Sequence, residues 1–97
     1  LTVSSLLREQ DHFGRTGGEE FLIVLPDTTL QQAEIIAERL RHAVAAIEVN
    51  DSKQPFSVTC SLGIAQSRHD ELLNITLGRA DDALYKAKAN GRNRSCQ

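Results

Sequence analysis

The sequence predicts a single α/β (α+β) domain, because three different apolar patterns follow one another within 97 residues. An unbroken apolar run over 21–25 is typical of a buried strand. Over 30–47, apolar residues recur at steps of three and four, as they do along one face of a helix. Over 56–65, large and small side chains alternate strictly, which is typical of a strand. No internal repeat or linker indicates a second domain.

Two strands and a turn are expected in the N-terminal third. Residues 1–9 carry apolar side chains at positions 3, 6 and 7, a spacing that favours the last turns of a helix. Residues 12–15 are expected to be extended, and Gly17-Gly18 supplies the turn into the next strand. The strand over 21–25 is apolar on both alternations, so we expect both of its faces to be covered, and Pro26 ends it.

The middle of the chain predicts a long helix and a second strand. Thr29 and Gln32 have the spacing of a capping box, in which each side chain can bond the other's backbone amide. The helix is expected over 30–47, followed by a polar loop over 48–55. Pro55 cannot donate to a ladder, so the next strand is expected to begin at residue 56. Gly63 in that strand should permit close approach of a neighbour.

A second helix is expected over 72–89, with Asn90-Gly91 as its stop signal. Cys60 falls in the predicted strand and Cys96 at the frayed end of the chain. Their separation matches neither a metal-ligand spacing nor a disulfide framework, so a reducing cytoplasm is the expected location. The apolar core should be modest, because a chain of this size buries only about two-thirds of its unfolded surface.

Composition excludes two classes of function. A formal net charge of −2 argues against a general nucleic-acid-binding domain, which usually carries a clear basic excess. No apolar stretch reaches the ~20 residues that a membrane-spanning helix needs, so no membrane contact is expected from this segment. The chain opens at Leu1 directly into apolar residues, without an initiator methionine or a leader. We therefore expect it to be part of a longer protein.

Residues 17–20 combine two glycines with two carboxylates at the mouth of the apolar strand. Glycine lets the backbone approach a ligand closely, and hard cations such as Mg²⁺ take carboxylate and phosphate oxygens together. This pattern predicts a site for a phosphate and its metal at Gly17, Gly18, Glu19 and Glu20. A solvated polar hairpin turn explains the same residues equally well, because short motifs often match by chance.

Cationic residues gather near the C-terminus. Lys88 and Arg92 are spaced i, i+4 across the end of the last predicted helix. Cations there also complement the negative end of a helix, which is the simpler explanation for either residue alone. Carboxylates for a metal and cations for the remaining charge would, however, suit one phosphate-bearing ligand. Together they suggest a nucleoside triphosphate.

Arg8 and Asp11, three residues apart, precede the glycine pair, and Arg39 lies on the flank of the long helix. Arg8 and Asp11 are most simply a surface ion pair, which contributes little to stability. The alternative is that Arg8 and Arg39 clamp a phosphate or a guanine edge, for which a planar guanidinium is suited.

Taken together, these motifs resemble the C-terminal part of a GGDEF domain, the diguanylate cyclase family. The name-giving motif reads Gly17-Gly18-Glu19-Glu20-Phe21, with glutamate at its third place. The resemblance continues through Ala37-Glu38-Arg39-Leu40-Arg41, Thr59-Cys60-Ser61-Leu62-Gly63-Ile64-Ala65, Ala80-Asp81-Asp82-Ala83-Leu84-Tyr85-Lys86-Ala87-Lys88 and Gly91-Arg92-Asn93-Arg94. Several motifs in the right order over nearly the whole chain make the resemblance specific.

The resemblance implies a nucleotidyl cyclase or polymerase-palm fold, with an antiparallel-rich sheet flanked by helices, truncated at its N-terminus. It implies a cytoplasmic enzyme that condenses two GTP molecules into cyclic di-GMP, with Mg²⁺ (or Mn²⁺) and a homodimer. Glu19 would bind the metal and serve as base for the 3′-hydroxyl, and Glu20 would be a second metal carboxylate. Gly17 and Gly18 would give the phosphates room, and Lys88 and Arg92 would bind the terminal phosphates.

The same resemblance implies product inhibition. Arg8 and Asp11 match the family's RxxD site and Arg39 matches its second arginine, so cyclic di-GMP would bind there. Thr16 departs from the family, which usually has an aromatic residue at that place. The family's first strand, with its metal-binding aspartate and guanine-reading residues, is not found in residues 1–97, so the domain is expected to be partial and the isolated piece inactive.

Two alternatives stay open. The parent protein could be a cyclic di-GMP sensor that has lost catalysis and binds through Arg8, Asp11 and Arg39. The 97 residues alone could instead form a strand-exchanged oligomer without a ligand, because unpaired strand edges favour association. The parent could also be anchored at the inner membrane through other domains.

Overall fold

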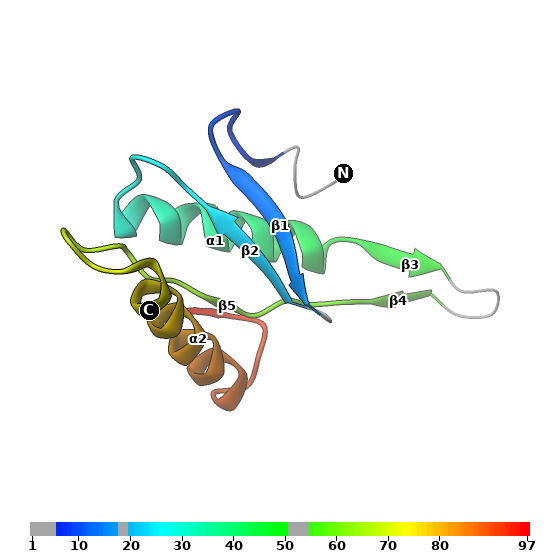
Figure 1. Cartoon of the computed structure of the whole chain (residues 1–97). Coiled ribbons are helices and arrows are strands. Elements are labelled where there is room, and N and C mark those ends of the chain that lie inside the picture. The colour runs from blue at the N-terminus through cyan, green and yellow to red at the C-terminus, as the bar shows by residue number, and fades with distance from the viewer. Residues whose placement is uncertain (1–5, 18–19, 51–54) are drawn as a thin grey trace.

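The computed structural model describes residues 6–17, 20–50 and 55–97, and within them the α+β prediction is confirmed (Figure 1). The elements in chain order are β1 His12–Gly17, β2 Glu20–Val24, α1 Leu30–Ala45, β3 Glu48–Asn50, β4 Pro55–Ser57, β5 Leu62–Gly63, α2 Leu73–Ala89 and β6 Ser95–Cys96. β1 and β2 form an antiparallel hairpin, β3 and β4 a second one, and β5 pairs with β6 in parallel. The described strands thus form three separate ladders rather than one sheet.

The β1–β2 hairpin confirms the two predicted strands but not the burial expected of the second. Phe21 is 56% exposed and Val24 is 44% exposed, so the prediction that both faces of this strand are covered is wrong for this structure. Phe21 stacks instead on Phe13 across the hairpin, with ring centroids 5.2 Å apart. The physical reason is that, in the described part of the chain, β1 is the one strand that pairs with β2.

The helix expected over 1–9 does not reach its predicted end. Residues 1–5 lie outside the described residues, and residues 7–10 contain a bend and a turn but no helical residue. The Asp11 carboxylate accepts the backbone N–H of Arg8 at 2.8 Å, and the Asp11 N–H donates to the Arg8 carbonyl at 3.0 Å. These bonds close a tight turn in place of a helical one, because an Asp side chain competes for the backbone groups that a helix would use.

The helix α1 begins where the capping box predicts. The Gln32 N–H donates to the Thr29 hydroxyl at 3.1 Å, and the Thr29 N–H donates to the Gln32 side-chain carbonyl at 3.0 Å. Two of the free amide donors at the helix start are thereby satisfied. Ala37 and Leu40 of the predicted apolar stripe are buried, whereas Ile47 lies beyond the last helical residue, Ala45.

The polar loop expected over 48–55 is wrong at both ends, because β3 and β4 form a hairpin there that projects from the body of the molecule (Figure 1). Pro55 is the first residue of β4 rather than the residue before it. The single strand expected over 56–65 is also divided: residues 58–61, which include Cys60, belong to no ladder. The alternation predicted an extended chain correctly but could not indicate that its two halves have different partners.

The end of α2 is as predicted. Asn90 caps the helix and Gly91 has a φ of 117°, which a side chain would strain. The Arg92 N–H donates to the Ala87 carbonyl at 2.9 Å, and the Gly91 N–H donates to the Lys88 carbonyl at 3.4 Å. This pair of bonds is a Schellman motif, which satisfies carbonyls that the helix end leaves free.

The C-terminus is ordered into β6, so the expected frayed end at Cys96 is wrong. The Ile64 N–H donates to the Cys96 carbonyl at 2.8 Å, and the Leu62 N–H donates to the Arg94 carbonyl at 2.9 Å. Cys60 and Cys96 are free thiols. The chain end is held because the exposed backbone groups of β5 accept a parallel partner.

The core lies where the β5–β6 ladder meets both helices (Figure 1). Its buried apolar members in the described chain are Ala37, Leu40, Ala83 and Ala87, which make the modest core expected for a chain of this size. Gly63 of β5 lies against the backbone of α2: a Cβ there would collide with the Ala80 carbonyl and the Leu84 amide. The predicted close approach at Gly63 is therefore confirmed. In the described ranges, no helix is long and apolar enough to cross a membrane.

Candidate nucleotide site

The tip of the β1–β2 hairpin is described on both sides but not at its centre. Gly17 and Glu20 pair across the ladder, with a register shift between Arg15 and Gly17. Gly18 and Glu19, to which the sequence assigns phosphate and metal binding, lie outside the described residues. Glu20 is exposed, and its carbonyl accepts the Thr16 hydroxyl at 3.4 Å. Thr16, which departs from the expected motif, thus bonds across the hairpin turn with its hydroxyl.

Within the described residues, the hairpin tip offers a metal ion one carboxylate ligand, Glu20. Across residues 6–17, 20–50 and 55–97, no three His, Cys, Asp or Glu side chains are grouped closely enough to hold a metal. In the same ranges the Glu20 carboxylate makes no hydrogen bond or ion pair, so its oxygens are available to a hard cation. Glu20 by itself fits the role of a metal ligand but does not complete a site.

The predicted cations lie at the end of α2. Lys88 is in its last turn, and Arg92 follows in the Schellman turn with a φ of 63°. The i, i+4 spacing suggested that Arg92 lies on the same helical face as Lys88. It does not, because the helix ends at Ala89 and Arg92 has a left-handed backbone. Both side chains are exposed, and neither makes an ion pair or hydrogen bond within the described chain. Two free cations close together in sequence, on a capped helix end, can receive an anion without first breaking another contact.

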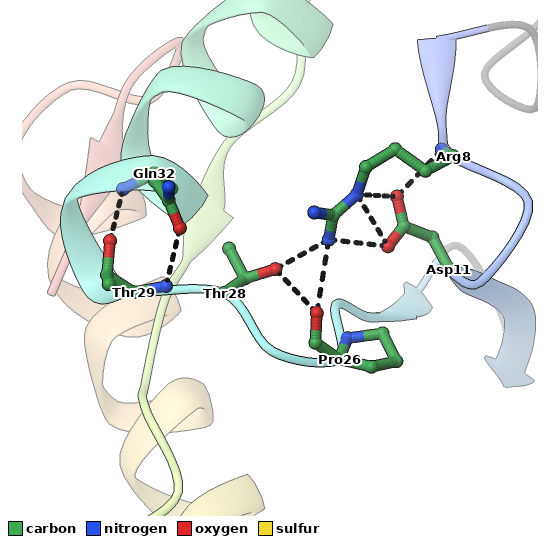
Figure 2. Close-up of polar contacts among 6 residues, drawn as sticks. All are labelled: Arg8, Asp11, Pro26, Thr28, Thr29 and Gln32. Carbon is green, nitrogen blue, oxygen red and sulfur yellow. Dashed lines mark hydrogen bonds and ion pairs between the residues drawn. The ribbon is translucent and has the colours of Figure 1, made fainter.

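The structure brings Arg8 and Asp11 together as the sequence suggested (Figure 2). The Arg8 Nη2 donates to Asp11 Oδ1 at 2.8 Å, and its Nε donates to Asp11 Oδ2 at 3.1 Å. The Asp11 side chain is only 1% exposed, against 40% for Arg8. Hydrogen bonding to the Arg8 guanidinium lowers the pKa of Asp11 below its ordinary value.

Arg8 also reaches the chain after β2. Its Nη2 donates to the Thr28 hydroxyl at 2.5 Å and to the Pro26 carbonyl at 3.3 Å (Figure 2). The turn before β1 is thereby attached to the segment that leads into α1. Arg39 is exposed on α1 and makes no polar contact within the described residues. The structure thus shows Arg8 engaged and Arg39 free.

A network at the C-terminal turn was not found from the sequence. Glu38 and Arg41, one turn apart on α1, form a two-bond pair with both donor–acceptor distances at 2.9 Å. Arg41 Nη1 then donates to Asn93 Oδ1 at 3.0 Å, and the Ser95 hydroxyl donates to Glu38 Oε2 at 3.0 Å. The i, i+3 spacing of Glu38 and Arg41 was a signal for the pair. Nothing in the sequence indicated the contacts to residues more than fifty positions away.

A third carboxylate–arginine pair, Glu71 with Arg79, fixes the start of α2. Glu71 accepts from Arg79 Nε at 3.2 Å, from the Thr76 hydroxyl at 2.5 Å and from the Arg68 N–H at 3.3 Å. These bonds, with that to Arg79 first, lower the pKa of Glu71 from 4.5 to about 2. A carboxylate here also complements the positive helix start. A shallow hollow of about 210 Å³ lies beside it, lined in part by Arg79, Arg68 and Ile64.

Comparison with known proteins identifies the class to which this fold and these residues belong. The family model described as diguanylate cyclase, GGDEF domain, matches residues 1–94. The chain therefore belongs to the GGDEF domain family, as the motifs predicted.

Relatives with names agree. The chain is 44% identical over 88 residues to diguanylate cyclase DgcP of Pseudomonas aeruginosa, covering 91% of the chain and 13% of that protein. It is 40% identical over 93 residues to diguanylate cyclase DgcM of Escherichia coli K12, covering 96% of the chain and 22% of that protein. The chain thus spans a quarter or less of either relative.

Solved structures share the fold. Diguanylate cyclase SiaD of Pseudomonas aeruginosa, in complex with its activator SiaC, superposes with a TM-score of 0.89 at 44% identity, over 95% of this chain and 35% of SiaD. The active GGEEF domain of a diguanylate cyclase from Vibrio cholerae superposes with a TM-score of 0.87 at 36% identity, over 97% of this chain and 60% of that one. The arrangement of α1, α2 and the ladders is therefore that of GGDEF domains.

Proposed function

We propose that the chain is part of the catalytic domain of a diguanylate cyclase, which condenses two GTP molecules into cyclic di-GMP. The single observation that carries the proposal is the capped end of α2, where the exposed cations Lys88 and Arg92 have no partner within the described residues. Such a site suits the terminal phosphates of a nucleotide, because fixed cations stabilise phosphate charge without first rearranging. Membership of the GGDEF family supports the same activity.

The proposal assigns the chemistry to the hairpin. Glu19 acts as base for the 3′-hydroxyl, Glu20 shares the binding of Mg²⁺ (or Mn²⁺), and Gly17 and Gly18 leave room for the phosphates. The exposed and unpaired Glu20 carboxylate supports its share of this assignment. When bound, the ion supplies neutralisation of the phosphate charge. The residues of the chain contribute the rest by orienting the triphosphate and holding the proton taken from the hydroxyl.

The reaction requires two copies of the domain. Each holds one GTP, and the 3′-hydroxyl of one nucleotide attacks the α-phosphate of the other, displacing pyrophosphate. Because two such attacks close one ring, the homodimer must place the two sites face to face. GTP supplies the substrate, so the proposal places the domain in the cytoplasm, where that nucleotide is made and used. The proposal also includes the expectation that residues 1–97 alone have no activity.

Product inhibition is part of the proposal. Cyclic di-GMP would bind Arg8, Asp11 and Arg39 and hold two domains apart. The bonded Arg8–Asp11 pair supports this assignment, because Asp11 orients the guanidinium before any ligand arrives. The exposed Arg39 supports it too, since its guanidinium is free to meet a phosphate.

The decisive experiment is GTP turnover by the full-length protein and its Glu19→Gln variant. We expect turnover to fall by at least about a hundredfold, because the variant removes a charge and a proton acceptor at the reacting hydroxyl. Cyclic di-GMP binding, measured by calorimetry, should be unchanged, since Arg8 and Asp11 are intact. Full activity of Glu19→Gln would refute the assignment of the base.

A second candidate function is a cyclic di-GMP sensor without catalysis, and the preformed Arg8–Asp11 pair favours it equally. The same experiment separates the two functions. A sensor binds cyclic di-GMP but converts no GTP in the unaltered protein, and Arg8→Ala abolishes that binding. An enzyme converts GTP, and Arg8→Ala only relieves its inhibition by product.

A further inference from the structure

The turn that carries Arg92 has a strained backbone. Gly91, Arg92 and Asn93 have φ values of 117°, 63° and 48° in succession. A residue other than glycine is strained in this region and keeps such a conformation only where the surrounding structure holds it. The backbone of Arg92 is bonded locally, to the Ala87 carbonyl and to the Arg94 side chain, whereas Asn93 is held by residues from elsewhere in the molecule. Contacts to Asn93 therefore help to determine where the Arg92 side chain leaves the backbone.

Those contacts come mainly from α1. Arg41 Nη1 donates both to the Asn93 carbonyl at 3.3 Å and to its side-chain Oδ1 at 3.0 Å. The Arg41 side chain is only 17% exposed, and the two bonds to Glu38 fix the plane of its guanidinium. A planar group held on one edge by a carboxylate presents its remaining donors in one direction, which a lysine could not do.

Two further hydrogen bonds join the turn and the residue that follows it to α1 and to the segment before β5. The Ser95 hydroxyl donates to Glu38 at 3.0 Å, beyond the turn, and the Asn93 N–H donates to the Ser61 hydroxyl at 3.1 Å. Hydrogen bonding to Arg41 lowers the pKa of Glu38 below its ordinary value, so this carboxyl stays charged and bonded to Arg41 at neutral pH. Glu38, Arg41, Asn93, Ser95 and Ser61 are called the turn clamp below.

We infer that Glu38 and Arg41 are positioning residues that, through the turn clamp, hold Arg92 beside Lys88 for the same terminal phosphates. The inference rests on the proposed function, because it gives Arg92 a phosphate to bind. It assigns a role in substrate affinity to two side chains that do not touch the substrate. Lys88 needs no such support, because it lies within α2 and its backbone is fixed by the helix.

The test compares KM and kcat for GTP in the full-length protein with Arg41→Gln and Arg92→Ala, alone and together. We expect each single variant to raise KM by about tenfold and to leave kcat within about twofold, because phosphate binding is lost equally from substrate and transition state. The double variant should be no worse than Arg92→Ala alone, since Arg41 acts through Arg92. A merely structural role would lower the active fraction and hence kcat, with KM unchanged.

Matched controls are available in the chain. Arg68→Gln removes an exposed arginine whose side chain has no partner in the described part of the chain, and Glu34→Gln removes an exposed carboxylate one turn before Glu38. Both should keep the KM of the unaltered protein, whereas Glu38→Gln should raise it. If Arg41→Gln does not fold, Arg41→Lys is the alternative variant. It retains the charge but cannot bond Glu38 and Asn93 at the same time in one plane, so it should raise KM several-fold.

The outcomes separate the inference from the proposed function. If Arg92→Ala raises KM while Arg41→Gln or Arg41→Lys folds and keeps it unchanged, the positioning role is wrong and the phosphate site stands. Additive effects in the double variant would also overturn the positioning role. If Arg92→Ala leaves KM unchanged, Arg92 binds no terminal phosphate, and the proposed phosphate site fails together with the inference.

Discussion

The β1–β2 hairpin is held by contacts between residues close in sequence, whereas the C-terminal region of α2, β5 and β6 is held by contacts between residues far apart in sequence. The hairpin is defined by pairing between neighbours, such as Gly17 with Glu20, and its large apolar side chain Phe21 stays mostly exposed. The C-terminal turn is held by three long-range hydrogen bonds. The residues that they join lie 32, 52 and 57 positions apart in the sequence. The hairpin is therefore specified locally, whereas the turn exists because α1 and β5 are already in place.

This difference matters for the proposed reaction. The carboxylates assigned to the metal lie at the locally specified hairpin, and the cations assigned to the phosphates lie at the region fixed by long-range contacts. A turn held from several elements loses little freedom when a phosphate binds, so its cations contribute more to affinity. Because α1 packs against the C-terminal region and holds its turn, we expect substitutions in α1 and in that region to change stability more than comparable substitutions in the hairpin.

The largest expected effect comes from Leu40→Ala, at the only large apolar side chain among the buried core residues of the described chain. Leu40 is 3% exposed, so its truncation leaves a cavity and should lower the free energy of unfolding by about 3 kcal/mol. Urea unfolding followed by circular dichroism measures the change. Ile35→Ala, on the same helix but 60% exposed, should cost less than about 1 kcal/mol. Phe21→Ala costing as much as Leu40→Ala would break the comparison.

Gly63→Ala is the next in size. Its new Cβ would meet the Leu84 Cα at 2.8 Å and collide with the Ala80 carbonyl, all rigid backbone atoms of α2. Overpacking of this kind costs about 1–3 kcal/mol, and we expect about 2 kcal/mol from thermal unfolding. Gly14→Ala is the matched change in the hairpin, where nothing lies within 4 Å of the added atom. Equal destabilisation by the two substitutions would show that the hairpin is packed as tightly as β5.

Thr29→Ala should cost about 1 kcal/mol, because it removes the side-chain acceptor at the start of α1. Chemical denaturation of the two proteins gives this difference directly. The comparison in the hairpin is Thr16→Ala, which removes only a long bond of 3.4 Å to the Glu20 carbonyl. That substitution should change stability by less than about 0.5 kcal/mol. A larger loss at Thr16 than at Thr29 would contradict the ranking of the two regions.

The last expected effect is a loss of stability in acid. The pKa of Glu71 is about 2 in the folded chain against 4.5 ordinarily, so the unfolded chain takes up this proton first. The stabilisation is therefore complete above about pH 4.5 and is lost as the pH falls towards 2. The pKa of Asp11 is also lowered, from 3.8, so its contribution is lost in the acid range as well.

Thermal unfolding between pH 6 and pH 2 tests this dependence, with Glu71→Gln as the variant and Asp82→Asn, an exposed carboxylate on α2, as its control. The Glu71→Gln protein should lose less stability on acidification than the unaltered protein, and Asp82→Asn should follow the unaltered protein. A Glu71→Gln profile parallel to that of the unaltered protein would mean that this pair does not stabilise the start of α2.

The sequence alone determined those features whose cause lies within a few residues. Thr29 and Gln32 predicted the start of α1, Asn90-Gly91 predicted the end of α2, and Gly63 predicted a close approach, because capping bonds and missing side chains act locally. The ordered motifs were sufficient to recognise the family, which the family model confirms.

Only the tertiary structure decided how distant segments meet. It divided the extended stretch 56–65 between β4 and β5, ordered the C-terminus as β6, left Phe21 exposed and joined Arg41 to Asn93. The physical reason is that an extended strand or a free guanidinium has many possible partners of equal chemistry. Which of them it meets depends on the packing of α1 and α2, which no short stretch of sequence contains.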